Sequence, residues 1–420
     1  MDTNELIKLR REFRQIAEVG WLEIQTTIKI IEYLKSLGYK VRYGKDIHSK
    51  NRLGVPPKEE YENYLKNIQL PNVDFDISEI KEGYTGCVAY MESKNPGPNI
   101  GMRVDIDALP LIESKDEDHL PTKLGFASKN EGFTHACGHD GHITIGLGVA
   151  KYIAENIDNL KGTYTLIFQP AEEGVRGASS MTEAGVVDHI DYLMGAHIGM
   201  NEKNGVLGVG TQNFLATAKY DVEFKGKMTH AAAAPELGKN ALLGAASCAL
   251  NLHTLPQFGK GMARLNVGVL NAGTGRNVVA ANAKMLLEVR GDTSENAKLI
   301  EEKMKKVVEG SAMQYDLEYS MTKMGEAAAF NTKHPEFTDM IADEMKKRGF
   351  EIDLRPSLGA SEDVSFMLKR VEENGGKCIH YLFGTQLSAP HHNEKFDYKE
   401  DVLDFGVKAF IETIDIFNKL

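Results

Sequence analysis

The chain alternates short apolar runs with helical stretches, and this alternation constrains its fold more than any other feature of the sequence. The apolar runs between Thr85 and Gly199 include TGCVAYME, NIGMRVDIDALP, GTYTLIFQPAEEG and DYLMGAHIG, with helical patterns between them. Such strand–helix alternation is typical of an α/β domain. We therefore expect a mostly parallel sheet with helices on both faces.

The order of strand and helix patterns changes after about Gly210. From there to about Gly325 the patterns read strand, helix, strand, strand, helix, strand, beginning with FLATAKYDVEFKG. The order βαββαβ is that of a ferredoxin-like unit. The sequence thus predicts that a lid domain, residues 212–325, interrupts a larger domain made of residues 1–211 and 326–420. A polar, proline-containing stretch at residues 45–80 is predicted to be an insertion on the surface.

Composition excludes several classes of protein. The net charge of -11 argues against a nucleic-acid-binding role. No apolar run is long enough to cross a bilayer, and the charged N-terminal stretch has no signal-peptide core, so we expect a cytoplasmic protein without a membrane partner. The four cysteines show no framework spacing and are expected to be free thiols.

Groups that suit metal chemistry follow the expected strands. They are Asp105 and Asp107 in VDIDALP, the motif HACGHDGH, Glu172 and Glu173 in FQPAEEG, His197 in GAHIG, and His391 and His392 in SAPHHNEKFDY. In open α/β sheets, the carboxyl ends of the strands form the ligand crevice. We therefore expect these groups to converge in space although they lie far apart in the chain.

The convergent groups could hold metal. In an extended turn, Cys137 and His139 point to the same side. Thiolate and imidazole suit zinc, and added carboxylate also suits manganese. The set is rich enough for two ions, which together can activate water and polarise a carbonyl. Of Glu172 and Glu173, one carboxylate can bind metal while its neighbour serves as a general base.

Each element of this pattern has an ordinary structural alternative when it is taken alone. A Cys-x-His pair can be buried packing, and a Glu-Glu pair can be a solvated surface feature. His197 could be a core histidine. His135 and His142 fit supporting positions better than ligand positions, and Asp105 and Asp107 are expected to orient the ligands. The placement of every cluster after a strand is what favours the metal site.

The lid domain carries further candidates. His230 lies in a loop of small residues before a helix, where it is either a surface histidine or a donor to the oxyanion that develops during the reaction. Arg276 and Asn277 flank a glycine turn, and Arg290 ends the next expected strand. The arginines could clamp a substrate carboxylate, or each could form a surface ion pair.

Together these motifs resemble the metal-dependent amidohydrolases related to aminoacylase, hippurate hydrolase and carboxypeptidase G. The matching segments are RVDIDALP, HACGHDGH, IFQPAEEGVRGA, GAHIG, GKMTHAAAAPELGKNA and HHNEKFDY. The resemblance implies two divalent ions per chain, manganese or zinc, a catalytic base at Glu172 and a lid role for His230. It implies metal ligands at Cys137, His139, Glu173, His197 and His392.

The resemblance also implies an activity and an assembly. The expected reaction is hydrolysis of the amide bond between an acyl group and an amino acid, in a homodimer joined through the lid domain. Some relatives work with a second, related subunit, so a heteromer is an alternative. The rival functions are a dipeptidase or carboxypeptidase and a non-catalytic partner subunit, and the intact Glu172 argues against the last of these. Many relatives have histidine where this chain has Arg14.

Overall fold

The computed structural model describes residues 1–420, and the chain divides into two compact units. The larger unit comprises Met1–Gln212, Asn331–Leu358 and Asp363–Leu420, and the smaller unit comprises Asn213–Phe330 with Gly359–Glu362. The sequence pattern predicts these boundaries after residues 211 and 325. Because residues 359–362 join the smaller unit, the chain enters that unit twice, which the sequence pattern did not indicate.

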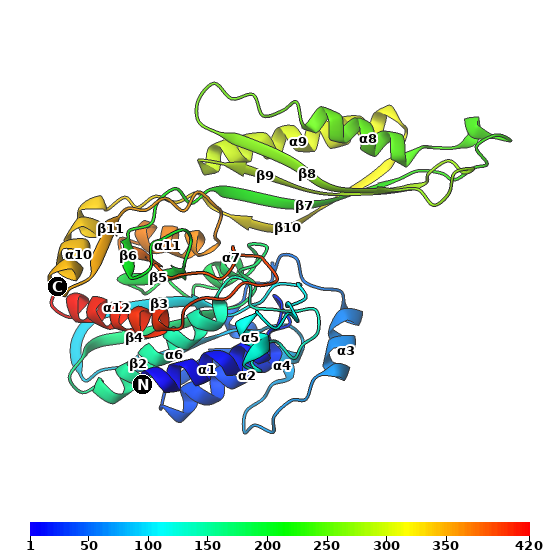
Figure 1. Ribbon diagram of the computed structural model, residues 1–420. Helices are drawn as coiled ribbons and strands as arrows, with labels where there is room; N and C mark the ends of the chain where they lie inside the picture. The colour runs from blue at the N-terminus through cyan, green and yellow to red at the C-terminus, as the bar shows by residue number, and fades with distance from the viewer. The chain divides into compact units, whose positions relative to one another are not determined.

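An eight-stranded sheet forms the centre of the larger unit, in the order β1-β2-β4-β3-β5-β12-β6-β11 (Figure 1). Its four middle strands, β4, β3, β5 and β12, are parallel, whereas β1–β2, β2–β4 and β12–β6 pair antiparallel. The predicted α/β class is confirmed, with antiparallel pairings toward the edges. The strands are β1 (Lys40–Tyr43), β2 (Cys87–Glu92), β3 (Asn95–Asp105), β4 (Lys161–Gln169), β5 (Tyr192–Ile198), β6 (Val206–Val209), β11 (Glu351–Leu354) and β12 (Lys377–Phe383).

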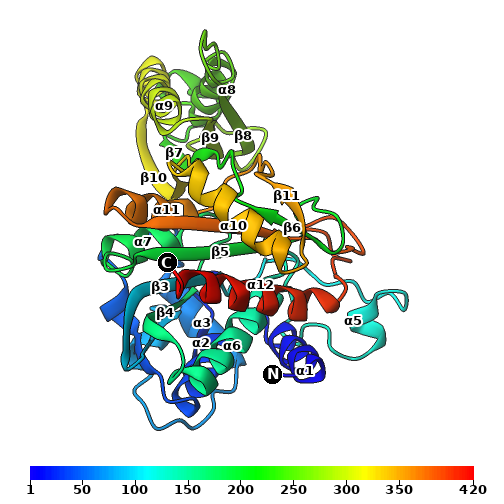
Figure 2. The same cartoon turned by 90° about the vertical axis from the view of Figure 1, so that its left-hand side faces the viewer.

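Helices cover both faces of this sheet. Helices α6 (His139–Asn156) and α12 (Asp401–Phe417) pack on one face, and α7 (Gly177–Glu183) and α11 (Val364–Glu373) pack on the other (Figure 2). Helix α6 approaches its neighbours closely: a Cβ atom added at Gly148 would lie 2.7 Å from a methyl carbon of Val407 on α12. Glycine at this position therefore allows α6 to pack closely against α12.

The remaining helices of the larger unit surround this core. They are α1 (Thr3–Gln15), α2 (Ile24–Ser36), the 3-10 helix η1 (Gly44–Ile47), α3 (Lys58–Asn67), α4 (Ser78–Lys81), α5 (Leu120–Lys123) and α10 (Pro335–Lys347). None of the helices in the chain is both long enough and apolar enough to cross a membrane.

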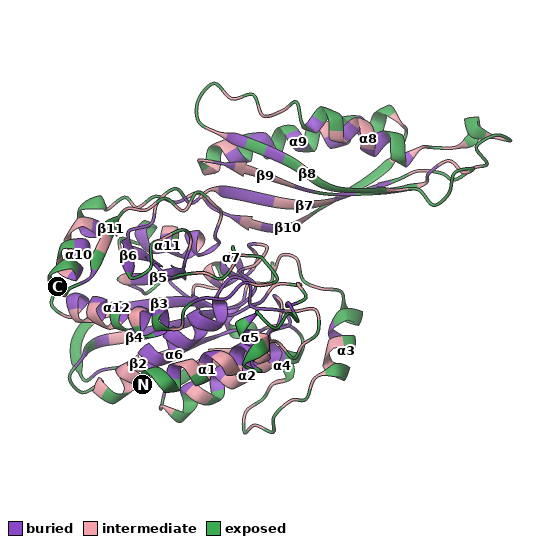
Figure 3. Cartoon of the chain, in the orientation of Figure 1, coloured by how far each residue is buried: buried purple, intermediate pink, exposed green.

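The smaller unit has the element order β7, α8, β8, β9, α9, β10 and an antiparallel sheet in the order β10-β7-β9-β8. Along β9, buried Ala283, Met285, Leu287 and Val289 alternate with more exposed residues, as expected for a strand with one covered face (Figure 3). Helices α8 and α9 cover that face. The elements are β7 (Ala216–Lys225), the 3-10 helix η2 (Pro235–Leu237), α8 (Ala241–Leu252), β8 (Ala263–Ala272), β9 (Asn282–Gly291), α9 (Ser294–Gln314) and β10 (Glu318–Ala327).

A buried ionic network connects α1 to α6 and to the chain segment before α12. The Arg10 guanidinium is fully buried and donates to Asp140, Asp397 and Glu400. Burial alone would raise the pKa of Asp140, but the charge of Arg10 lowers it to about 2. The carboxylate therefore stays ionised at neutral pH, and its burial depends on the arginine.

We expect Arg10→Ala to lower the free energy of unfolding by about 3–5 kcal/mol, because it removes the nearest counter-charge of the buried Asp140 and Asp397 and leaves them only the more distant Arg14, at 3.7 and 3.9 Å. Arg11→Ala is the matched control: Arg11 is one-third exposed, forms an ion pair with Glu400 and lies over the Phe126 ring, so its loss should cost at most about 1–2 kcal/mol. Urea unfolding at pH 7, followed by circular dichroism, measures both. Equal effects of the two substitutions would contradict the role assigned to the network.

Candidate metal centre

The predicted metal-ligating groups meet beyond the carboxyl ends of β3, β4 and β5. The Cys137 Sγ atom lies 3.4 Å from His197 Nε2, and His139 completes a group in which one donor atom from each residue lies within 4.8 Å of the others. Cys137, Glu173 and His392 form a second such group, with His392 Nε2 3.4 Å from Glu173 Oε1. The two groups together contain all five expected ligands, and they share the Cys137 sulfur.

The turn between Cys137 and His139 differs from the extended turn predicted from the sequence. Gly138 has a φ of 96°, in the left-handed region that favours glycine, and it caps α6, whose first residue is His139. The left-handed residue reverses the chain direction between the two donors. Cys137 and His139 therefore reach one point from a loop and from a helix start.

The two inner histidines direct their Nε2 atoms to this point. His139 Nδ1 donates to the main-chain oxygen of Asp107 at 2.9 Å, and His197 Nδ1 donates to that of Ile198 at 2.8 Å. In its neutral form each ring therefore holds the lone pair on Nε2, and the buried Nε2 of His139 has no hydrogen-bond partner in the protein. Burial alone would lower the pKa of His139, but the charge of the nearby Asp105 outweighs it and raises that pKa well above its usual value, so a metal ion at this point displaces a proton from the ring. Burial and the neighbouring His142 lower the pKa of His197, which favours the neutral ring that binds metal.

The cysteine also fits a metal ligand. Burial, with a contribution from the nearby Glu173, raises the pKa of the Cys137 thiol well above its usual value. A thiolate at this position consequently needs a cation beside it. The donor set of one thiol, three imidazoles and a carboxylate suits borderline divalent ions, so the residues present fit a divalent-metal site.

The loop that carries Glu172 and Glu173 is held by three successive main-chain amides. Ala171 N donates to Glu23 Oε1 at 2.7 Å, and the amides of Glu172 and Glu173 donate to the two carboxylate oxygens of Asp107 at 3.0 and 2.9 Å. Ala171 has a φ of 53°, an unusual value for a residue other than glycine. In this irregular loop both glutamates face the cluster, with Glu172 Oε2 4.0 Å from His139 Nε2 and Glu173 near His392.

His142 lies among the ligands, but hydrogen bonds engage both of its nitrogens. Its Nδ1 donates to Asp105 Oδ1 at 2.5 Å, and its Nε2 accepts from the main-chain amide of Ile198 at 2.9 Å. Asp105 also accepts from Arg103 at 2.9 Å. His142 and Asp105 therefore brace the end of β5 rather than offer a free donor to a metal.

His391 and His392 have different surroundings. His391 Nε2 lies 3.1 Å from the main-chain oxygen of Ile198, which also accepts from His197, and its ring lies edge-on to that of His197. His392, by contrast, is the residue that approaches Glu173. His391 thus contacts the Ile198 oxygen that holds His197, whereas His392 belongs to the second donor group.

Glu23 was not identified from the sequence, although it contacts the Glu172–Glu173 loop. It is fully buried, and its second oxygen accepts from the Thr85 hydroxyl at 2.7 Å. Burial, together with the charge of Asp107, raises the pKa of Glu23 to about 8. The only hint in the sequence is an acidic residue within the apolar stretch WLEI, which by itself is not specific.

The predicted residues of the smaller unit lie in two adjacent loops and on β9. His230 is exposed, and its Nδ1 accepts from the amides of Ala232 and Ala233, so the neutral ring carries its proton on Nε2. The main-chain oxygen of Asn277 accepts from Ala231, which brings the two loops together. Arg276 is exposed, whereas Arg290 forms a two-point ion pair with Glu288.

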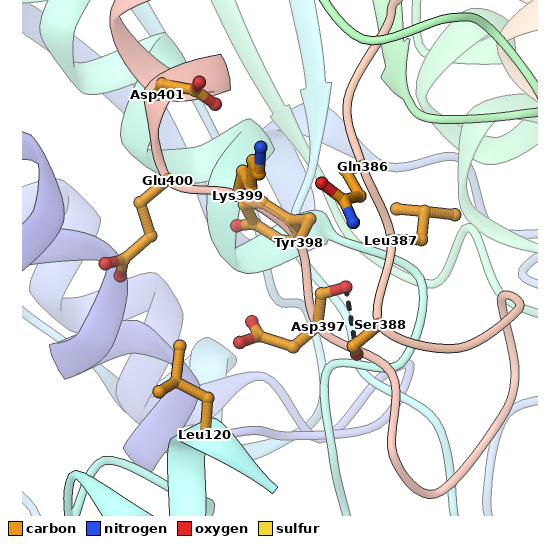
Figure 4. Close-up of a pocket in the computed structure, with 9 residues that line it drawn as sticks. All are labelled: Leu120, Gln386, Leu387, Ser388, Asp397, Tyr398, Lys399, Glu400 and Asp401. Carbon is orange, nitrogen blue, oxygen red and sulfur yellow. Dashed lines mark hydrogen bonds between the residues drawn. The ribbon is translucent and has the colours of Figure 1, made fainter.

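A surface hollow of about 480 Å³ lies at the base of the loop that carries His391 and His392 (Figure 4). Ser388 closes this base, since its amide and hydroxyl both donate to the main-chain oxygen of Asp397. None of the five expected ligands lines this hollow, so it is separate from the two donor groups. Its lining residues are Leu120, Gln386, Leu387, Ser388, Asp397, Tyr398, Lys399, Glu400 and Asp401.

Comparison with known proteins identifies the family. The family model for "Peptidase family M20/M25/M40" matches residues 101–415, which include every expected metal ligand. The chain belongs to this family. It is a metal-dependent amidohydrolase, as the sequence motifs implied.

Relatives with assigned names extend the match to almost the whole chain. One subunit of the p-aminobenzoyl-glutamate hydrolase of Escherichia coli is 40% identical over 412 residues, covering 96% of this chain and 94% of that protein. The indole-3-acetyl-aspartic acid hydrolase of Enterobacter agglomerans is 40% identical over 414 residues, covering 97% and 95%. The crystal structure of the aminobenzoyl-glutamate utilization protein from Klebsiella pneumoniae has a TM-score of 0.80 and 34% identity, covering 98% of this chain and 95% of that one.

These comparisons also confirm a narrower resemblance. The segments GTGRNVV and FGTQLSAPHHNEKFDY, with the insertion at residues 45–80, resemble that same subunit of p-aminobenzoyl-glutamate hydrolase. The identity of 40% to the E. coli protein extends over residues on both sides of these segments.

The contacts of Glu23 generate a prediction. Glu23→Ala removes the acceptor of the Ala171 amide, so the Glu172–Glu173 loop should no longer be held in position. We expect kcat to fall by about 10²-fold because the two carboxylates are then misplaced. KM and the metal content should change little, because no expected ligand is removed. Glu23→Gln, whose amide oxygen can still accept from Ala171, should recover most of the rate. If Gln and Ala reduce kcat equally, Glu23 does not act by holding this loop.

Proposed function

We propose that the chain hydrolyses N-acyl amino acids, with p-aminobenzoyl-glutamate as the leading substrate and p-aminobenzoate and glutamate as products. The observation that carries the proposal is the pair of donor groups sharing Cys137, with the Glu172 carboxylate beside His139. The names of the relatives support this substrate, and indole-3-acetyl-aspartate is the nearest competitor.

In this proposal two divalent ions, manganese or zinc, occupy the two donor groups. One group is Cys137, His139 and His197, and the other is Cys137, Glu173 and His392. The ions would supply polarisation of the scissile carbonyl and a lowered pKa for water. The shared sulfur supports a pair of adjacent ions over two separate sites.

Glu172 is the proposed general base. Its amide is fixed by Asp107, and its carboxylate lies 4.0 Å from His139 Nε2 without belonging to either of the two donor groups that share Cys137. Glu172 does lie within donor distance of His139 and Glu173, so it is placed to act on a water held at the same centre. Glu172 would take the proton from the attacking water and deliver it to the nitrogen of the leaving amino acid. Glu173 cannot share this task while its carboxylate is committed to His392 and Cys137.

The smaller unit contributes to the proposal through His230, Asn277 and Arg276. The Nε2–H of His230 is a neutral donor of the kind that stabilises a developing oxyanion. Arg276, which forms no ion pair within the chain, is a better candidate than Arg290 for binding a substrate carboxylate. A homodimer joined through this unit is the proposed assembly. A heteromer is the alternative, and it is supported by the E. coli relative, whose name makes it one subunit of its enzyme.

A substrate comparison tests the function. The purified chain, supplied with manganese or zinc, is assayed with p-aminobenzoyl-glutamate, indole-3-acetyl-aspartate, N-acetyl-glutamate and glycyl-glutamate. We expect p-aminobenzoyl-glutamate to give the highest kcat/KM. A faster reaction with glycyl-glutamate would instead identify a dipeptidase, and no hydrolysis of any compound would favour a non-catalytic subunit.

The separate roles of the two glutamates give a second test. Glu172→Gln should keep its metal and lose about 10²–10⁴-fold in kcat, because an amide cannot accept the proton. Glu173→Gln should lose metal as well as activity. Elemental analysis with single-turnover assays distinguishes them, and Glu183→Gln, an exposed glutamate at the end of α7, is the matched control. Metal loss in Glu172→Gln and retention in Glu173→Gln would reverse the two assignments.

A further inference from the structure

The inserted stretch after β1 is attached to the loop that carries Glu172 and Glu173. Arg176 makes the connection: its Nε donates to the main-chain oxygen of Glu173 at 3.0 Å, and its NH1 donates to that of Gly54 at 3.1 Å. One guanidinium group therefore spans the distance between Gly54 and Glu173. Gly20 leaves the space for it, since a Cβ atom added there would lie 2.2 Å from Arg176 NH2.

Apolar packing reinforces this attachment. The Trp21 indole donates to the main-chain oxygen of Leu53 at 2.8 Å. Trp21 also packs in a buried cluster with Tyr61 of α3 and with Ala171, the residue directly before Glu172. The insertion is thus joined to the Glu172–Glu173 loop after the glutamates, through Arg176, and shares a buried cluster with Ala171 just before them.

The other side of the stretch is anchored as well. Arg52 donates to the main-chain oxygen of Gly83, and its guanidinium lies 3.6 Å from the centre of the Tyr84 ring. His48 is buried and contacts the Thr85 oxygen at 2.8 Å and the Ser180 hydroxyl at 3.3 Å. His48 and Arg52 are anchored before residues 53–57, and Tyr61 is buried after them. This short segment therefore has a defined position in the larger unit.

The sequence of this feature is Leu-Gly-Val-Pro-Pro, which has no charged or hydrogen-bonding side chain. Val55 directly follows the Gly54 carbonyl that Arg176 holds, and it is 37% exposed. The neighbouring cation, Arg52, is already engaged by Gly83 and two aromatic rings. The side chains of residues 53–57, which we call the apolar rim, can therefore offer a ligand van der Waals contact only.

We propose that the apolar rim binds the acyl half of the substrate and selects aromatic acyl groups. This inference rests on the proposed function. An N-acyl amino acid has two unlike halves: the amino acid carries carboxylates, which need cations or N–H donors, whereas an aromatic acyl group needs apolar surface. The rim is joined to the Glu172–Glu173 loop by Arg176, and its side chains can satisfy only the second requirement. Both p-aminobenzoyl and indole-3-acetyl groups belong to this chemical class.

The test compares two substrates with the same amino acid. Val55→Asp should lower kcat/KM for p-aminobenzoyl-glutamate by about tenfold or more, mainly through KM, because it puts a charge against the aromatic ring. N-acetyl-glutamate, whose acyl group is too small to reach the rim, should change by less than about twofold. Leu354→Asp on β11, another exposed apolar residue, is the control and should change neither. An equal loss for both substrates, or a loss for neither, overturns the proposal.

A binding measurement separates this proposal from the proposed function. Titration with p-aminobenzoate, the acyl product, needs no turnover, and Val55→Asp should bind it about tenfold or more weakly than the parent. If the parent hydrolyses neither substrate but the titration shows this difference, the proposed function is wrong, whereas the binding of the acyl group by the rim is supported. If parent and variant bind p-aminobenzoate equally, the rim does not contact the acyl group, whatever the activity.

Discussion

Asp107 is the residue on which the geometry of the candidate metal centre depends. Its main-chain oxygen accepts from His139 Nδ1, and its two carboxylate oxygens accept from the amides of Glu172 and Glu173. One residue thereby fixes the start of α6 relative to the loop after β4. The two amides also compensate for the burial of the carboxylate, which would otherwise be costly. The spacing between the ligands and the base follows from these three hydrogen bonds.

The sequence was sufficient to predict the elements and the place where their ends meet. Apolar runs alternating with helical patterns indicated the parallel centre of the sheet, and the polar motifs after each run indicated a common edge. The antiparallel pairing of β12 with β6 was not predictable in this way. Periodicity shows that a stretch is a strand, but the direction of its neighbour depends on connections through the smaller unit and on packing far along the chain.

The supporting residues were harder to identify than the expected ligands, for a physical reason. Glu23 meets its partner amide across 148 residues, and Arg10 meets Asp397 across 387. No local pattern distinguishes these side chains from solvated charges on an amphipathic helix. The ligands stand out because thiol, imidazole and carboxylate crowd into short motifs. A buried arginine or glutamate becomes recognisable only when the fold shows that it is buried.

Arg14 shows how such a supporting position can vary while the expected ligands stay the same. Its guanidinium donates to Glu113, to the main-chain oxygen of Phe396 at 2.7 Å and to that of His135 at 3.3 Å. It therefore joins the loop before Cys137 to the segment after His392, and both loops carry donors of the second group. A histidine, which the resemblance places here in many relatives, has one donor at most on each ring nitrogen and could not make the same set of bonds. The difference at residue 14 thus changes how the two loops are held together, and it leaves the donor atoms themselves unchanged.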